Sequence, residues 1–402
     1  MNRIEIKQMI WIILFVVMVG CSAKPKEHSK VDQPKYPLKE ALVRLSNCFT
    51  IEPDSLGFPR CLEPSGEIRG VPSKDWTSGF YPGSLWLAYG VSKDAKYKEL
   101  AQKWLVFSEK EKWNDRTHDM GFKINCSFGN AYKFDKKDAY KDVIIQSAKT
   151  LLTRYNETFG SLRSWDHGSW EFPVIVDNMM NLELLFLATE LSGDSIFYDV
   201  AQQHALTTLK NHFRKDFSSY HVVNYDTITG KVIAKETHQG FSDESSWARG
   251  QAWGLYGFTM CYRETGNVLF KKQAEKIAKF IMSHPQMPKD KIPYWDYNAP
   301  DIPNAPRDAS AAAITASALY ELQNYSKDGI TYTTFADAII SSLSSEKYII
   351  EQNSKHPFIL NHSTGNMPKN DEVDVPISYA DYYYLEALIR KENINNNTKD
   401  KL

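Results

Sequence analysis

One pattern recurs along this 402-residue chain and constrains its fold more than any other feature. An apolar helix end is followed by Ser or Thr, then Gly or Lys, then Asp or Asn, with an aromatic residue three positions later and an Ala four after that. The Gly or polar residue ends one helix, the Asp or Asn caps the next, and the aromatic and Ala face inward at helical spacing. The repeating unit is therefore a helical hairpin. The clearest copies are Ser92-Lys93-Asp94 with Tyr97 and Ala101, Ser192-Gly193-Asp194 with Phe197 and Ala201, and Thr265-Gly266-Asn267 with Phe270 and Ala274, and looser copies occupy 136–148 and 326–336.

These turns predict repeated helix pairs that bury one another's apolar faces. Extended segments are few, and 221–225 with 231–234 can form one small β-hairpin around Thr229-Gly230. Periodicity alone allows either an open solenoid or a closed α/α toroid. A closed ring is favoured because aromatic and polar residues gather in the connections, and a toroid collects its connections around one central cleft.

The composition agrees with a large buried core, since 42% of the residues are hydrophobic. The 48 Lys and Arg residues are balanced by 49 Asp and Glu residues. This balance argues against nucleic-acid binding, because phosphate contacts need a surplus of basic side chains. The chain also holds 22 Tyr, 20 Phe and 10 Trp, and aromatic side chains often line sugar-binding clefts.

The N-terminal residues 1–21 have the layout of an export signal, with a charged start, an apolar run at 9–19 and a small residue, Gly20. The run is shorter than the roughly 20 residues that a bilayer-spanning helix needs. The segment Met-Val-Gly-Cys at 18–21 resembles a bacterial lipoprotein processing site, at which Cys21 would carry the lipid. The alternative is an ordinary signal peptide with a coincidental Cys. We expect an exported protein, lipid-anchored through Cys21 and periplasmic or outer-membrane.

The composition also suggests the domain boundaries. Residues 22–37 hold four Lys and three Pro with no aromatic before Tyr36, which predicts a flexible tether. A single domain should then cover 38–390, followed by a disordered tail at 391–402 that is rich in Asn and Lys.

The remaining cysteines leave two interpretations open. Cys48 and Cys61 could pair in an oxidising compartment, or all four cysteines could be buried free thiols. No CxxC or Cys/His spacing is typical of zinc, so we expect no metal.

Two of four connections combine residues that suit a sugar-binding cleft. In 76–83, Trp76 precedes Phe and Tyr between Gly and Pro, which suggests either an aromatic rim or a packed helix entry. In 116–122, Asp119 follows His118 in a loop, as a general acid/base pair or as a helix cap with a satisfied neighbour. Taken alone, the cap is the simpler interpretation.

A third connection contains Trp165 and leads to Asp177, which stands at the start of an apolar helix and follows the apolar residues 174–176. A carboxylate in this position either caps the helix or lies in an apolar pocket. In an apolar pocket its pKa would be raised, so that it could donate a proton near neutral pH.

The fourth connection, 237–253, is the least ordinary stretch of the chain. Arg249 and Trp253 are four residues apart and share a helix face, where they would offer a fixed cation and a stacking ring to one ligand. Thr237 and Gln239 add hydrogen-bond donors from the preceding loop. Together these residues favour an anionic sugar.

At this point the sequence resembles a known family, the unsaturated glucuronyl hydrolases of glycoside hydrolase family 88. The likeness covers about residues 38–390 with the motifs in the family's order, and it implies an all-α fold, an (α/α)6 toroid of six helical hairpins. It also implies cleavage of unsaturated uronic acids from oligosaccharides made by polysaccharide lyases. The stretches that carry it are 76–83, 117–122, 176–182, 245–253, 372–376 and 379–383.

The resemblance also implies roles for single residues. Asp177 matches the general acid/base and Asp119 the second essential carboxylate. His221 matches the family's active-site His, and Gln239 and Arg249 match its polar contacts to the uronate. The full predicted substrate-binding set is Trp76, His118, Trp165, His221, Thr237, Gln239, Arg249 and Trp253, with Trp76 and Trp253 as aromatic walls.

The implied chemistry is hydration of the C4=C5 double bond that a lyase leaves in the sugar, with Asp177 as acid and then base. It needs neither metal nor other cofactor. Ordinary glycosidases differ in placing two carboxylates across the anomeric carbon. Three alternatives stay open: an unsaturated rhamnogalacturonyl hydrolase, an inverting glycosidase on the same toroid, and a lipid-anchored glycan-binding protein without turnover.

The partners that we expect are unsaturated uronic-acid oligosaccharides of glycosaminoglycan or ulvan type, with no nucleic acid and with membrane contact only through the lipid. In the loop 362–369, Ser363 and Lys369 could contact a sulfate, or the Lys could simply be solvated. The sequence does not rank the possible lyase products.

Overall fold

The computed structural model describes residues 37–54, 57–351 and 354–396, which belong to one compact unit. The predicted export signal, Cys21 and the tether as far as residue 36 lie outside the described residues.

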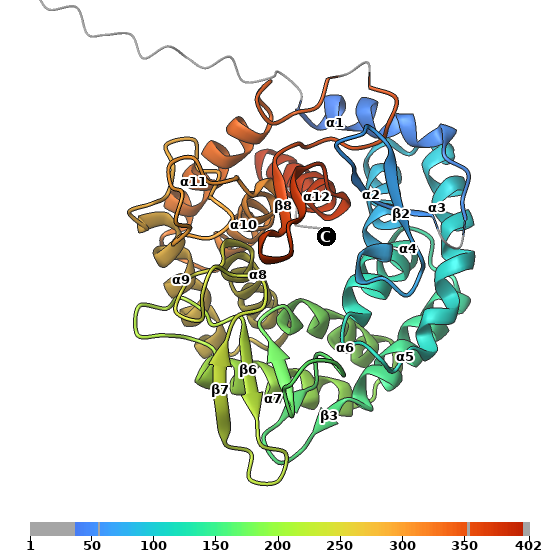
Figure 1. Cartoon of the computed structure of the whole chain (residues 1–402). Helices are drawn as coiled ribbons and strands as arrows, with labels where there is room; N and C mark the ends of the chain where they lie inside the picture. The colour runs from blue at the N-terminus through green and yellow to red at the C-terminus, as the bar shows by residue number, and fades with distance from the viewer. Residues whose placement is uncertain (1–36, 55–56, 352–353, 397–402) are drawn as a thin grey trace, which may run out of the picture. The chain divides into compact units, whose positions relative to one another are not determined.

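The helices of this unit form two concentric rings of six (Figure 1). Each inner helix contacts the next, and the last contacts the first, so the ring is closed. The predicted (α/α)6 toroid is therefore confirmed. The inner ring comprises α2 (Phe80–Ser92), the continuous helix of η4 (Gly121–Gly129) and α4 (Asn130–Phe134), α6 (Asn178–Ser192), α8 (Ala248–Thr265), α10 (Ala309–Leu322) and α12 (Ser378–Asn395). The outer ring comprises α1 (Pro37–Leu45), α3 (Ala95–Ser108), α5 (Asp138–Leu152), α7 (Ser195–Asn211), α9 (Val268–Ser283) and α11 (Gly329–Leu343).

The structure contains the predicted hairpin turns, with the helix ends and helix caps at the expected residues. Gly193 and Gly266 end α6 and α8 with φ of 77° and 65°, the left-handed conformation that glycine adopts without strain. Asp194 caps the following helix by accepting from the amide of Ile196 at 3.0 Å. The aromatic and Ala of each copy are buried as expected, including Phe197 at 1% exposure.

The inner helices are covered on nearly every side. All residues of α10 are buried, and its many Ala and Ser side chains let the neighbouring helices approach closely. The outer helices bury one stripe and expose the other, as amphipathic helices do.

Short antiparallel strands occupy the connections. The predicted hairpin is present as β6 (Val222–Tyr225) and β7 (Val232–Glu236), in the register Val223↔Lys235, and β5 (Pro173–Ile175) extends it to three strands. The other hairpins, which the sequence did not predict, are β1 (Phe58–Leu62) with β2 (Ile68–Val71), β3 (Tyr155–Asn156) with β4 (Ser161–Leu162), and β8 (Ser363–Asn366) with β9 (Asp371–Val375).

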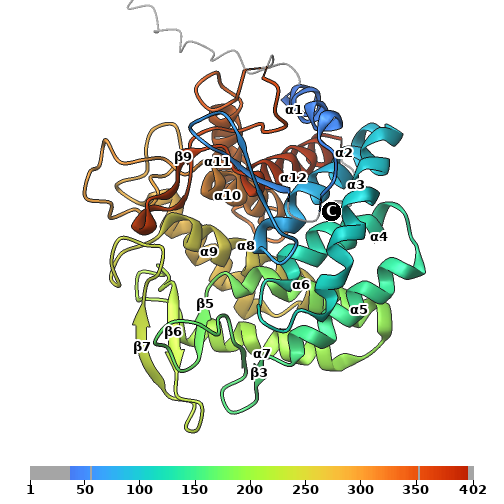
Figure 2. The ribbon, with the colours of Figure 1, turned by 45° about the vertical axis from the view of Figure 1, so that its right-hand side comes forward.

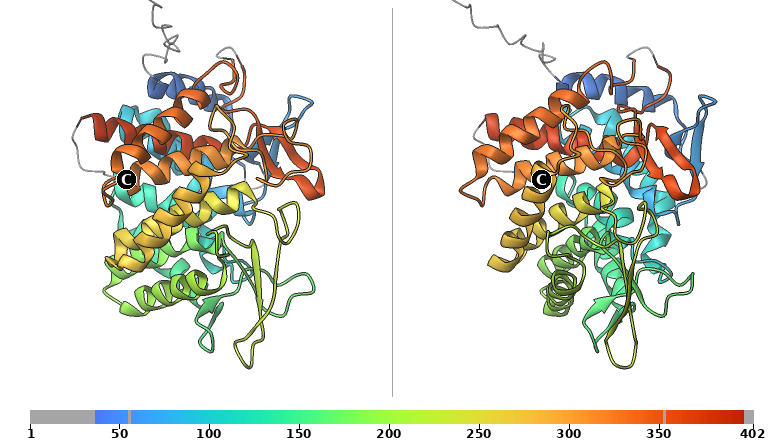
Figure 3. Two further views of the ribbon diagram at one scale, coloured as in Figure 1. Left: turned by 90° about the vertical axis from the view of Figure 1, so that its left-hand side faces the viewer. Right: turned by 60° about the vertical axis from the view of Figure 1, so that its left-hand side comes forward.

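The two ends of the barrel differ in their connections. At one end, turns of two to six residues lead from the first five inner helices to the outer helix that follows each. At the other, connections of 12 to 36 residues lead into the inner helices and carry all the strands named above. Figure 2 and Figure 3 show these hairpins gathered on one side of the helices. Long connections often carry function, so a site is expected among the N-terminal ends of the inner helices.

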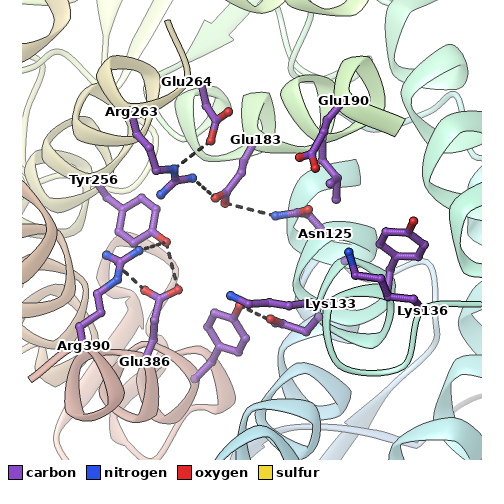
Figure 4. Close-up of a pocket in the computed structure, with 15 residues that line it drawn as sticks. Asn125, Lys133, Lys136, Glu183, Glu190, Tyr256, Arg263, Glu264, Glu386 and Arg390 are labelled. Atoms are coloured by element: carbon purple, nitrogen blue, oxygen red, sulfur yellow. Dashed lines mark hydrogen bonds and ion pairs between the residues drawn. The ribbon is translucent and has the colours of Figure 1, made fainter. Parts of the chain in front are cut away.

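The opposite end of the barrel is held by ion pairs (Figure 4). Arg263 in the last turn of α8 pairs with Glu183 of α6 and, at 2.9 Å, with Glu321 of α10. Arg390 of α12 pairs with the same Glu321 at 2.8 Å. These bonds join four inner helices around a cavity of about 260 Å³.

The structure corrects one prediction about the chain's C-terminal end and decides between the two interpretations of the cysteines. The tail was expected to begin at 391, but α12 continues to Asn395 because Ile394 still packs against the core. Cys48 and Cys61 are buried free thiols, so the disulfide alternative is not realised. Among the described residues, none of the helices has the length and apolar character that a membrane span requires.

Candidate active site

A cleft of about 240 Å³ opens at the end of the barrel that carries the long connections. Its lining comes from the starts of inner helices and from the β1–β2 and β8–β9 hairpins. Among the sequence-predicted site residues, Trp76, His118, Asp119, Trp165, Asp177, Gln239 and Arg249 line this cleft together. His221, Thr237 and Trp253 do not.

Asp177 lies between β5 and α6 and is 8% exposed. Its side chain makes no capping hydrogen bond to α6, so the helix-cap interpretation does not hold. Burial raises the pKa of Asp177 from the ordinary 3.8 to about 7; the Arg249 charge opposes the rise, and the nearby Asp119 adds to it. The carboxyl group is therefore able to give and take a proton near neutral pH.

His221, directly before β6, faces Asp177 from behind the cleft wall. Its Nδ1 accepts from the backbone amides of His238 at 3.1 Å and Gln239 at 3.2 Å, so this nitrogen carries no proton. Burial lowers the pKa of His221 well below its ordinary value, and the ring is neutral. The proton is then on Nε2, which lies 3.5 Å from Oδ2 of Asp177.

Asp119 and His118 form a second pair immediately before η4. Nδ1 of His118 lies 2.8 Å from the Ser164 carbonyl, which only accepts, so Nδ1 is the protonated nitrogen. The other ring nitrogen, Nε2, faces Oδ1 of Asp119 at 3.1 Å. The hydroxyl of Thr117 donates to the second oxygen of Asp119 at 3.0 Å. The Thr117 hydroxyl thus fixes the Asp119 side chain beside the His118 ring, and the start of η4 has no side-chain cap.

Arg249, in the first turn of α8, is 1% exposed and is already bonded to the protein. Nη1 donates to Asp308 at 2.8 Å and to the carbonyl of Thr364, and Nη2 donates to the carbonyl of Gly365. Asp308 also caps α10 through the amide of Ser310. The arginine therefore brings a fixed positive charge to the cleft wall and ties β8 to the barrel.

Two half-buried tryptophans provide flat walls. Trp76 begins η2 (Trp76–Gly79) and packs against Phe122 and Tyr379, with ring centroids 5.4 and 5.0 Å apart. Trp165 lies on the other connection, stacked on His167 at 5.4 Å and beside His238 at 4.9 Å. Aromatic faces of this kind suit stacking against a sugar ring.

Two predicted ligand contacts are corrected by the structure. Trp253 does not form an aromatic wall, because it is fully buried between Phe122 and Tyr383; its indole N–H instead lowers the pKa of Asp177. Thr237 organises its own loop, where its hydroxyl accepts from the Gly240 amide at 2.8 Å. The loop residue Ser363, considered for sulfate binding, is also buried, whereas Lys369 does line the cleft.

The structure adds cleft residues that sequence reasoning did not single out. They include Arg60 of β1 and Glu372 of β9, which are bonded to each other across 312 positions of the chain. Nothing local marks such a pair: Arg60 is an ordinary charge in a short strand, and Glu372 stood out only as part of the stretch 372–376 that carries the family resemblance. His238 belongs to the predicted connection 237–253 but was not singled out in it. Burial lowers the pKa of His238 to about 4, and the nearby positive charge of Lys369 lowers it further. The described residues contain no group of three His, Cys, Asp or Glu placed to hold a metal.

One family model and several known proteins are similar to this chain. The model of Glycosyl Hydrolase Family 88 matches residues 63–386. An unsaturated glucuronyl hydrolase of Formosa agariphila is 52% identical over 399 residues, which are 96% of this chain and 99% of that protein. A crystal structure of an unsaturated glucuronyl hydrolase specific for heparin superposes with a TM-score of 0.87 at 46% identity, covering 90% of this chain and 97% of the other. The Bacillus sp. GL1 unsaturated glucuronyl hydrolase, responsible for glycosaminoglycan degradation, gives 0.83 at 30% identity over 89% and 96%.

Proposed function

The chain belongs to glycosyl hydrolase family 88, and from this premise we propose that it is an unsaturated glucuronyl hydrolase. Its substrates are oligosaccharides produced by polysaccharide lyases, from which it removes the Δ4,5-unsaturated uronic acid at the non-reducing end. The observation that carries this proposal is Asp177, a buried and uncapped carboxyl group facing the cleft with a pKa of about 7. Names of similar proteins that refer to heparin and to glycosaminoglycan degradation support products of that class.

The reaction begins at the alkene rather than at the anomeric carbon. Asp177 gives its proton to C4, and a water molecule adds to C5 while returning a proton to the same carboxylate. The hemiketal that forms at C5 opens and releases the neighbouring sugar. One water is consumed and Asp177 ends in its starting state, so a single carboxyl group with a pKa near 7 is sufficient for both proton transfers.

The neighbouring residues set the surroundings of this carboxyl group. His221 directs its Nε2 proton toward Asp177 and stays neutral, so it does not stabilise the ionised form as a full charge would. The Asp119–His118 pair stands at the same cleft, where its oxygens can accept from sugar hydroxyls. Trp76 and Trp165 supply faces for the sugar rings.

The similar proteins favour the glucuronyl reaction over the rhamnogalacturonyl alternative. A binding protein without turnover would use the same walls but would not need Asp177. Changing Asp177→Asn separates the two, because a binding protein keeps its affinity and has no turnover to lose.

The direct test is a panel of unsaturated disaccharides made by lyases from chondroitin, hyaluronan, heparin and ulvan. We expect the ultraviolet absorbance of the conjugated alkene to disappear on incubation with the protein. Matched saturated disaccharides serve as the control and should stay intact. Cleavage of the saturated sugars with the unsaturated ones left unchanged would contradict the proposal.

We also propose that the protein is exported and lipid-anchored through Cys21. The support is the sequence alone, namely the apolar run at 9–19 followed by Gly20 and Cys21. Fractionation of cells that express the wild type and Cys21→Ser tests this. The proposal predicts membrane association for the wild type only, and equal association of both would contradict it.

A further inference from the structure

The β9 strand places one carboxylate, Glu372, against the cleft in an unusual set of contacts. It is 7% exposed and accepts from Nε and Nη2 of Arg60 at 2.6 and 2.8 Å, a two-point contact. Arg69 of β2 pairs with it as well, at 2.7 Å. Burial alone would raise the pKa of Glu372, but the two arginines hold it below the ordinary value. Glu372 is therefore a charged carboxylate whose two oxygens are both bonded to arginines of the protein.

The backbone of this hairpin is held in a conformation that it would not adopt by itself. Asn370, Glu372 and Asp374 have φ of 48°, 54° and 60°, in the left-handed region that residues with a Cβ avoid. Such conformations persist only where surrounding contacts stabilise them enough to offset the strain, and they cluster at functional sites. The contacts that hold Glu372 are those with Arg60 and Arg69.

Glu372 lies directly against Gly365 on the paired strand β8. A Cβ added at Gly365 would lie 2.6 Å from Cβ of Glu372, closer than side chains approach. The carbonyl of Gly365 accepts from Nε2 of Gln239 at 3.1 Å and from Nη2 of Arg249. Both of these residues line the cleft, so Gly365 is the point at which the hairpin meets them.

On its other side, Glu372 is linked to the wall formed by Trp76. Arg60 uses its remaining Nη1 to pair with Asp75 at 2.9 Å, and its guanidinium lies 6.0 Å from the Trp76 ring. Asp75 caps η2 by accepting from the Thr77 amide at 2.9 Å. One chain of contacts thus runs from the tryptophan through Arg60 and Glu372 to Gly365. In Figure 3 the β8–β9 and β1–β2 hairpins stand side by side on the same face, and β1 and β9 are in contact.

We propose that Glu372 is a positioning residue for substrate binding, which fixes the Trp76 wall and the Arg249–Gln239 wall relative to each other through Arg60 and Gly365. This inference rests on the proposed function. Among the described residues, Glu372 makes no hydrogen bond or ion pair with Asp177 or Asp119, so its loss should affect substrate binding more than the proton transfers.

The test is the steady-state kinetics of Glu372→Gln on a lyase-made disaccharide that the wild type cleaves. Misplaced walls should raise KM about tenfold and leave kcat within roughly threefold. Asp374→Asn is the matched control: it lies two residues on, has a similar φ, and pairs with His362 instead of lining the cleft. Its KM and kcat should equal those of the wild type.

Arg69→Gln provides a second variant if Glu372→Gln does not fold. It removes one partner of Glu372 at a residue that is 30% exposed and outside the cleft lining, and it should raise KM in the same direction by about threefold. Two outcomes would overturn the inference. In the first, Glu372→Gln and Arg69→Gln have the same KM and kcat as Asp374→Asn. In the second, their kcat falls while KM stays constant. A wild type without turnover on any unsaturated sugar would overturn the proposed function and, with it, this inference.

Discussion

Replacing Asp177 by Asn should remove turnover and, at the same time, change how stability depends on pH. In the wild type the Asp177 carboxyl is protonated in both the folded and unfolded chain below its ordinary pKa of 3.8. Between that value and about 7 the unfolded chain releases the proton while the folded protein keeps it. Wild-type stability therefore falls over this window as the pH rises, and the loss is complete above about 7.

The size of the effect follows from the two pKa values. A tenfold change in proton affinity corresponds to about 1.4 kcal/mol, so a rise from 3.8 to about 7 gives about 4 kcal/mol. Asn has nearly the same shape and does not ionise. Relative to the wild type, the Asn variant should gain up to about 4 kcal/mol of unfolding free energy between pH 4 and pH 8.

The assay is urea unfolding of both proteins at several pH values, combined with alkene absorbance for turnover. Removal of the acid should lower kcat by at least about 10²-fold. In the wild type, kcat/KM should fall about tenfold for each pH unit above about 7, because the donor is then ionised.

A matched control is Asp381→Asn. Asp381 is also buried, with a pKa raised to about 8, but it accepts from the backbone amides of Ile359 and Leu360 and does not line the cleft. It should alter the pH dependence of stability and leave kcat within about twofold. The raised pKa of Asp177 would be refuted if wild type and Asp177→Asn differed in unfolding free energy by the same amount at pH 4 and pH 8. Retained turnover in Asp177→Asn would refute the assignment of Asp177 as the acid.

Two further changes test the walls and the far end of the barrel. Trp165→Ala should raise KM about tenfold, because the sugar loses a stacking surface. Trp165→Phe keeps an aromatic ring and should bring KM most of the way back to the wild-type value. Equal KM values for the two variants would exclude a stacking role. Arg263→Gln should lower the unfolding free energy by about 2 kcal/mol, since it leaves Glu183 and Glu321 without their shared cation, while kcat stays within about twofold. Unchanged urea unfolding of this variant would contradict the structural role of that network.

The helical hairpins could be predicted because their signals are local, whereas the ring of six hairpins was implied by the family resemblance. Each hairpin turn combines a residue that ends a helix with one that caps the next, as at Gly193 and Asp194, and both act within a few residues. The β8–β9 hairpin gave no such signal. Its conformation depends on positive φ at non-glycine residues such as Glu372, and that residue is held by Arg60 from the other end of the chain.

The site shows the same division between local and long-range information. The spacing of Arg249 and Trp253 correctly places them on one inner helix, but spacing does not say how deep each side chain lies. Trp253 is fully enclosed, whereas Trp165 lines the cleft. For Asp177 the sequence left a helix cap open, and for Asp119 it made the cap the simpler interpretation; only the side-chain contacts decide against both.

Electrostatic attraction for an anionic sugar does not rest on one free arginine. The terminal nitrogens of Arg249 are bonded to Asp308 and to β8 carbonyls, and Arg60 is paired with Glu372 and Asp75. The lining residue Lys369 is exposed, and none of the acidic side chains in the described part of the chain is paired with it. The helices α6 and α8 also begin at the cleft, at Asp177 and Arg249, and each helix start carries a partial positive charge. Because these charges are local and fixed, a chain of net charge -1 is able to bind an acidic substrate without an overall basic surface.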